Sequence, residues 1–161
     1  NYGAKESGNS LFTREYLGYA NSSGFVRGYS FTSFDDPNEC TASATGACAE
    51  QERLLGTRVG LASLELRVPL FGTESYGLLN FPYLPTEISF FADGGVSWTA
   101  EEAPDLRWET DPTRDRIPVF SAGVSSRFNL FGYTVLEIFY AHPFQRPAKG
   151  AHFGFQLIPG W

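Results

Sequence analysis

The stretch FVRGYSF, residues 25–31, places a single cation in an aromatic setting. The neighbours of Arg27 are Phe25, Val26, Gly28, Tyr29 and Phe31. A loop surrounded by water needs neither these aromatic side chains nor a charge among them. A guanidinium group binds a carboxylate through two parallel hydrogen bonds. We therefore expect the loop to pack against the rest of the chain, and Arg27 to have a partner further along it.

The two cysteines, Cys40 and Cys48, lie close together in the polar segment NECTASATGAC. Two cysteines so near each other in one loop favour a local disulfide bond, and hence an oxidising compartment. The alternative is a pair of free loop thiols. A metal site on the two thiols is not expected, because His142 and His152 are remote in the sequence.

Other segments carry weaker signals for chemistry. Residues 101–115 are acidic and could bind a divalent cation weakly, but their spacing fits no EF-hand and nearby arginines offset the charge, so a solvated loop is expected. The sequence has no G-x-S-x-G, P-loop, H-E-x-x-H or G-x-G-x-x-G motif. We therefore predict no enzymatic activity, no cofactor and no metal.

Five segments alternate apolar and polar residues, as β-strands with one apolar face do. They span residues 57–70, 87–98, 118–129, 133–142 and 151–158, and a weaker strand is expected at about 10–18. The polar faces of these segments carry Glu65, Arg67, Glu87, Asp93, Arg127 and Glu137. The apolar faces carry residues such as Leu64, Leu66, Phe90, Val124 and Tyr140. The sequence therefore predicts an all-β fold.

Composition and length agree with β structure in one domain. The chain of 161 residues is 16% aromatic and contains 17 glycines, a mix typical of strands and turns. The net charge is −6 and no basic stripe stands out, which argues against nucleic acid as a partner. The sequence contains no run of 18 apolar residues, so it predicts no transmembrane helix.

The predicted strands are long enough to cross a bilayer. About ten residues, tilted by about 45°, span the hydrocarbon core. The mean hydropathy of −0.20 is compatible with this, because a barrel strand alternates lipid-facing and lumen-facing residues. A soluble sandwich would alternate too, but strand length and aromatic content favour an antiparallel transmembrane β-barrel.

The connectors also vary in length as they do in barrels. Segments 19–56, 99–116 and 143–151 are long or polar, whereas 130–133 is a tight turn. We expect the long connectors on the outer side, and 71–86, 130–133 and Trp161 at the periplasmic rim.

Two motifs together resemble a known signature. VRGY (Val26, Arg27, Gly28 and Tyr29) followed by FADGG (residues 91–95) is similar to the paired motifs of the bacterial surface-antigen superfamily. This superfamily comprises outer-membrane barrels of the BamA, TamA and two-partner-secretion type. The resemblance implies that loop 19–56 enters the barrel lumen and that Arg27 meets Asp93 on the inner wall.

The resemblance also assigns roles to individual residues. The loop lock consists of Val26, Arg27, Gly28, Tyr29, Phe91, Asp93 and Gly95. Alternation puts Asp93 on the lumen side of its strand, and Gly94 and Gly95 are expected to leave room for the loop tip. The alternative is an exposed Arg27 and an Asp93 that belongs to an ordinary Asp-Gly turn.

The end of the chain resembles the C-terminal strand signal by which such barrels are recognised for assembly. The signal residues are Phe153, Phe155, Leu157 and Trp161. Pro159 and Gly160 are expected to interrupt the alternation and to shorten the seam that the last strand makes. Trp161 is also compatible with anchoring at the membrane interface.

The resemblance implies that residues 1–161 are the C-terminal five or six strands of a larger barrel of about sixteen. An N-terminal part or another chain would supply the remaining strands. The expected function is insertion, assembly or translocation of proteins at the bacterial outer membrane, with the lipid bilayer and client outer-membrane proteins as partners. Alternatives are a barrel that anchors a fused domain, a structural membrane component, or a soluble ligand-binding sandwich.

Overall fold

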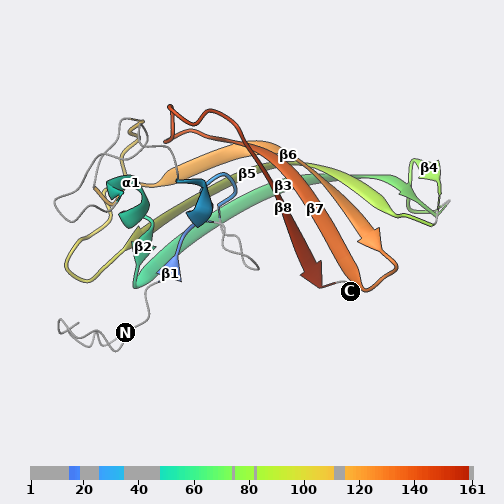
Figure 1. The fold of residues 1–161 in the computed structure, drawn as a ribbon, viewed down its shortest axis with the longest axis horizontal. Helices are drawn as coiled ribbons and strands as arrows, with labels where there is room; N and C mark the ends of the chain where they lie inside the picture. The colour runs from blue at the N-terminus through green and yellow to red at the C-terminus, as the bar shows by residue number, and fades with distance from the viewer. Residues whose placement is uncertain are drawn as a thin grey trace.

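A computed structural model describes residues 15–18, 26–34, 48–73, 75–81, 83–110 and 115–159 of the chain. These residues form a mostly β structure built on one curled, mostly antiparallel sheet (Figure 1). The order of strands in this sheet is β4-β3-β5-β6-β7-β8. The expectation of an all-β fold is confirmed.

The five long strands follow one another along the chain and pair as antiparallel neighbours. Their bounds are β3 Arg58–Gly72, β5 Thr86–Trp98, β6 Val119–Leu130, β7 Thr134–Pro143 and β8 His152–Pro159. Each bound lies within two residues of the one that alternation predicts. The short strand β4, Leu79–Asn80, adds a parallel pair at the end of β3.

Short elements lie outside this sheet. Strand β1, Glu15–Tyr16, pairs with β2, Leu55–Gly56. Of the strand expected at 10–18, residues 15–18 are described, and β1 covers the first two of them. A helical turn α1 spans Ala49–Glu52, and a 3-10 turn spans Phe31–Ser33. Apart from the weak signal at 10–18, alternation gave no signal for these short elements, because two to four residues are too few to show a period.

The sheet has two chemically different faces, and we call the one covered by residues 15–18, 26–34 and 48–56 the inner face. The buried apolar core lies between these segments and the sheet, and consists of Leu17, Val26, Tyr29, Leu54 and Val119. A second buried cluster on the same face joins Phe91, Phe139 and Ala141. The core is therefore on one side of the sheet only.

The outer face is apolar and open. One row of paired residues runs across all five long strands: Leu66, Phe90, Val124, Tyr140 and Phe153. All five side chains are exposed, from 41% for Val124 to 66% for Leu66. No described segment covers this row, so an apolar surface stays exposed across the described part of the sheet.

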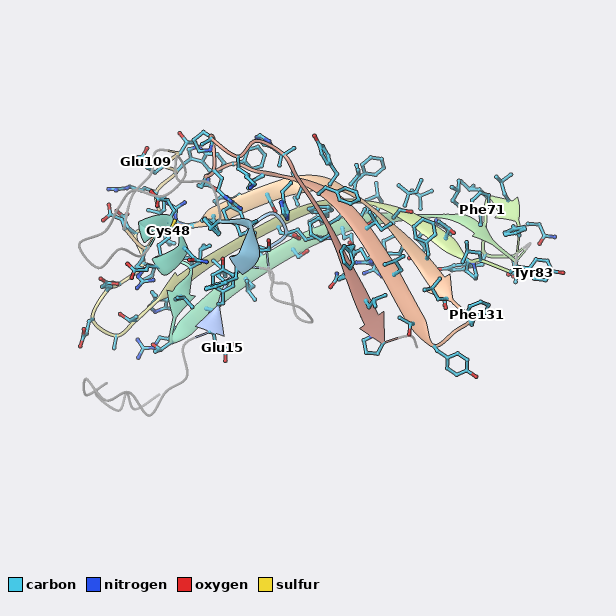
Figure 2. All side chains as sticks on the ribbon, in the orientation of Figure 1. Glu15, Cys48, Phe71, Tyr83, Glu109 and Phe131 are labelled. Carbon is cyan, nitrogen blue, oxygen red and sulfur yellow. The ribbon has the colours of Figure 1, made fainter. Side chains whose placement is uncertain are left out.

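The connectors divide between the two ends of the sheet. Segments 26–34, 48–56 and 99–110 gather at one end, and β4 lies at the other (Figure 1). Figure 2 shows Phe71, Tyr83 and Phe131 far from Cys48 and Glu109. At the β4 end, the backbone N–H of Asn129, near the end of β6, donates over 2.9 Å to the carbonyl of Pro85, the residue that precedes β5.

Both edges of the sheet are open among the described residues. Strand β8 pairs only with β7, and β3 beyond β5 meets only the two residues of β4. The expected interruption at Pro159 is wrong: Pro159 is part of β8, pairs with Thr134, and keeps the alternation. Proline is tolerated because β8 is an edge strand, where a missing N–H leaves no ladder bond unmade. Gly160 lies outside the described residues.

Among the helices of the described residues, none combines the length and the hydropathy that a membrane span requires.

Candidate functional site

The side chain of Arg27 binds Asp93 through both carboxylate oxygens. Nε donates to Oδ2 over 2.7 Å and Nη2 donates to Oδ1 over 3.0 Å. The backbone N–H of Arg27 adds a third bond to Oδ2 at 3.3 Å. The contact expected from the paired motifs is therefore present, with the two-pronged geometry that guanidinium and carboxylate favour.

The same guanidinium group reaches two further carboxylates. Nη1 donates to Glu65 Oε1 over 3.1 Å and to Glu137 Oε1 over 3.0 Å. These residues belong to β3 and β7, while Asp93 belongs to β5. One loop side chain thus connects three strands of the sheet.

An aromatic ring covers the guanidinium plane. The Cζ atom of Arg27 lies 3.5 Å from the centroid of the Phe91 ring, which is the geometry of a cation–π contact. This ring comes from the sheet, not from the loop: Phe31 is exposed and packs edge-on against Tyr16. Phe25 lies outside the described residues. Phe31, a neighbour of Arg27 in the sequence, therefore packs against Tyr16, whereas Phe91 covers the guanidinium group.

A second arginine completes the network. The guanidinium of Arg127 donates to both oxygens of Glu65, over 3.1 and 3.0 Å, and reaches Glu137 at 3.4 Å. Glu137 pairs in register with Arg127 on one side and with Gln156 on the other, and Gln156 donates to it. All five long strands therefore contribute at least one polar side chain.

The network is balanced in charge. Its three carboxylates, on Glu65, Asp93 and Glu137, face the guanidinium groups of Arg27 and Arg127, and the half-exposed Arg67 binds Glu65 from the rim. The Ser63 hydroxyl donates to Asp93 Oδ1 over 2.7 Å. Asp93 and Glu137 are almost fully buried. Burial of charge is tolerated only with such pairing, and loss of one partner is strongly destabilising.

Two glycines allow the loop to come this close. Gly28 has a φ of 90°, a backbone conformation that other L-residues rarely adopt. A Cβ on Gly95 would lie 2.6 Å from Leu17 Cδ1 and 3.0 Å from Val26 Cγ2, so this position must stay bare. Gly94 does not leave room for the loop as expected, because it faces the other side of the sheet, against Phe120.

The remaining motif residues bury the loop tip. Val26 and Tyr29 are fully buried in the core. The Tyr29 hydroxyl lies within hydrogen-bond distance of Phe120 O and Gln145 Oε1, and accepts from the backbone N–H of Gln145 over 3.1 Å. Burial raises the pKa of Tyr29, so the phenol stays protonated and remains a donor.

The chemistry of the site is that of an anchor. A hollow of about 360 Å³ borders the network and is lined by Glu65, Arg67, Arg127 and Gln156, among others. The carboxylates next to it are already bonded to guanidinium groups. No group of three or more metal-binding side chains occurs within the described ranges.

The other predicted residues divide between described and undescribed parts of the chain. Cys48 is disulfide-bonded, and Cys40, the other cysteine of the sequence, lies outside the described residues. Phe153, Phe155 and Leu157 alternate on the outer face of β8 and are exposed. Trp161 lies outside the described residues.

Sequence reasoning missed part of the site. Glu65, Arg127 and Glu137 were placed on the polar strand faces, but nothing in their spacing assigned them to Arg27. Strand register supplies part of that information: it sets Glu137 opposite Arg127, and Arg27 binds the same glutamate. Gln145 and Arg146, which also contact the loop, lie in a polar connector without any pattern that marks them.

Comparisons with protein-family models, with characterised proteins and with solved structures found no match for this chain.

We predict that Asp93→Asn lowers the free energy of unfolding by about 3–5 kcal/mol, because a buried guanidinium loses its closest opposite charge. The matched control is Asp105→Asn, which breaks an exposed ion pair with Arg107 and should cost less than about 1 kcal/mol. Urea unfolding followed by tryptophan fluorescence measures both. Equal losses for the two variants would contradict the role of the network.

We predict that Gly95→Ala lowers the free energy of unfolding by about 1–3 kcal/mol, because the new methyl group overlaps Leu17 and Val26. Gly60→Ala is the control: its Cβ would meet nothing closer than a Trp98 ring atom at 3.4 Å. The same unfolding experiment compares the two. If Gly95→Ala is no worse than Gly60→Ala, the loop does not press against β5 as described.

Proposed function

We propose that this chain forms part of a bacterial outer-membrane β-barrel of the surface-antigen type, and that the protein acts in the insertion, assembly or translocation of other proteins at that membrane. The observation that carries the proposal is the contrast between the two faces of the sheet. An apolar face without charge meets lipid, while the face with the buried ion network and the loop lines the lumen.

The outer face has the chemistry of a lipid-facing band. Every second residue of each long strand points outward, starting from the first number of each of the ranges 60–68, 88–98, 120–130, 134–142 and 153–159. None of these outward residues is Asp, Glu, Lys or Arg. On β6 this face extends from Phe120 to Leu130, roughly 33 Å along the strand at about 3.3 Å per residue. A tilt of about 40° reduces this to about 25 Å, the height of the apolar band of outer-membrane barrels.

Exposed aromatic side chains mark both ends of this band. Tyr83, Phe131 and Tyr133 lie in connectors at the β4 end, and each is more than four-fifths exposed, at 82%, 89% and 84%. Trp108 lies in the connector at the opposite end, is 59% exposed, and stacks on Phe120. Aromatic rings at these levels suit the two interfaces between lipid and water.

The open edges support a larger barrel. Five long strands are too few to close, since the smallest barrels have about eight. An apolar sheet with two unpaired edges would associate with other strands. In the proposed barrel, the edges of β3 and β8 pair with further strands, from the same protein or from another chain.

The loop has a mechanical role in this proposal. Arg27 connects β3, β5 and β7 from the lumen side, so the loop tip stabilises the pairing of the strands around it. The role in protein assembly rests on the resemblance of VRGY and FADGG to the superfamily motifs. The alternative, a barrel that anchors a fused domain or is a structural component, shares the same membrane structure.

We predict that Val124→Lys, in the middle of the outer row, lowers the stability of the membrane-inserted protein by about 2–4 kcal/mol. Water would accept this exposed lysine at almost no cost, so the variant distinguishes lipid from water. Phe131→Lys, in an exposed turn at the end of the band, is the control and should have little effect. Urea titration of the protein in lipid vesicles gives both values. A tolerated Val124→Lys would overturn the membrane proposal.

We predict that depletion of the whole protein from its host lowers the amounts of other outer-membrane proteins, and that Arg27→Ala or Asp93→Ala restores them only in part. Quantitative mass spectrometry of outer-membrane fractions measures the effect. Arg107→Ala, in an exposed connector, serves as the control. Unchanged amounts of other outer-membrane proteins after depletion would reject the assembly role and favour a barrel that anchors a fused domain. Full activity and normal heat-modifiability of both lock variants would reject the lock.

A further inference from the structure

A second buried arginine holds the loop from the opposite direction. Arg146 lies just after β7 and is only 4% exposed. Its Nη1 donates to Gly28 O over 2.8 Å and to Ser33 Oγ over 2.7 Å, and its Nη2 donates to Ser33 O over 2.9 Å. Its Cζ lies 3.9 Å from the centroid of the Phe34 ring. One guanidinium therefore binds the loop both before and after its 3-10 turn.

Gln145, the residue before Arg146, also binds the loop. The backbone N–H of Gln145 donates to the Tyr29 hydroxyl, and Gln145 Oε1 accepts the backbone N–H of Phe120 over 2.7 Å. The turn that follows β7 thus contacts the loop at Gly28, Tyr29 and Ser33. Its position is fixed in turn by β6, through Phe120.

The two arginines act on adjacent residues of the loop. Arg27 directs its side chain from the loop into the sheet, whereas Arg146 directs its side chain from the sheet connector onto the carbonyl of Gly28. That carbonyl belongs to Gly28, the residue with the positive φ, so its direction depends on an unusual backbone conformation. A buried carbonyl requires a donor, and Arg146 supplies it.

The same kind of bond connects the other connectors at this end of the sheet. Arg53 donates to Gln145 O over 3.2 Å, which joins the α1 segment to the turn. Arg116 donates to Glu52 O over 2.9 Å and to Leu55 O over 2.7 Å, which joins the 99–116 connector to the α1 segment. Bonds from arginine to carbonyl thus lead in series from Arg116, at the end of the 99–116 connector, to the loop tip.

We propose that Arg146 is a positioning residue, which seats the loop so that Arg27 reaches its three carboxylates. The planar fork of Arg146 is required, because it binds at once an acceptor before the 3-10 turn, on Gly28, and acceptors on the last residue of that turn, Ser33. This inference extends the loop lock of the proposed function and rests on it, but its test reads the position of the loop rather than protein assembly.

The test uses cleavage by trypsin after Arg27 in the full-length protein, purified in detergent and analysed by mass spectrometry. In the seated loop Arg27 is buried, so cleavage requires release of the loop. Arg146 precedes Pro147, so residue 146 is not itself a cleavage site in the wild type or in its lysine variant. We expect Arg146→Ala to raise the initial rate of cleavage after Arg27 about tenfold or more, since three charge-assisted bonds are lost.

Two further variants make the result specific. Arg146→Lys keeps the charge but not the fork, and should give a clear, smaller increase in cleavage after Arg27. Arg107→Ala removes an exposed arginine whose ion pairs stay within its own connector, and should cleave like the wild type. Cleavage after Arg127, within β6, reports general unfolding and should stay low in all variants.

The outcomes separate the hypotheses. A wild-type rate for Arg146→Ala would overturn the positioning role, and so would a rise in cleavage that is equal after Arg27 and Arg127. A wild-type rate for Arg146→Lys would also overturn it, because charge alone would then suffice. Selective release of the loop, in a protein whose depletion leaves other membrane proteins unchanged, would support the positioning role and reject only the assembly function.

Discussion

The structure depends on how one guanidinium group is neutralised away from water. Arg27 enters the inner face of the sheet from a loop, and three carboxylates on three strands share its charge. Those carboxylates would repel one another without it, and Arg127 alone faces only two of them. The ring of Phe91 covers the cation and excludes solvent from it. The glycines, the turn after β7 and the core around Tyr29 all serve to bring the cation to this place.

The division of the sheet into two faces follows from the same requirement. A network of buried charges needs neighbours that are polar or covered, so the inner face carries serine, glutamine and the loop itself. The outer face has no such partner and consists mainly of aliphatic and aromatic side chains. In the proposed membrane setting, each face has the solvent that its chemistry requires. The apolar face would gain from lipid what a globular sheet gains from a second layer.

Alternation in the sequence predicted the five long strands and their faces, because period-2 patterning reflects burial directly. The contact of Arg27 with Asp93 was expected because two short motifs occur together. The roles of Glu65 and Glu137 were not, since they depend on which residues the register places side by side. Arg146 was missed for a different reason: it binds carbonyl groups, and a carbonyl leaves no mark in a sequence. Phe91, rather than a loop aromatic, covers the cation because strand geometry turns it to the same face as Asp93.

The direct pairing of Glu137 with Arg127 and Gln156 has a consequence for how the strands find their alignment. A shift of one residue would turn every side chain to the wrong face, and apolar patterning alone prevents it. A shift of two residues keeps the faces intact, and hydrophobicity would barely detect it. It would, however, set Glu137 against Ser125 or Asn129 in place of Arg127, and so remove one of the two cations that this buried carboxylate binds. The ion network thus helps to set the strand register, because it disfavours the two-residue shifts that the apolar pattern alone would allow.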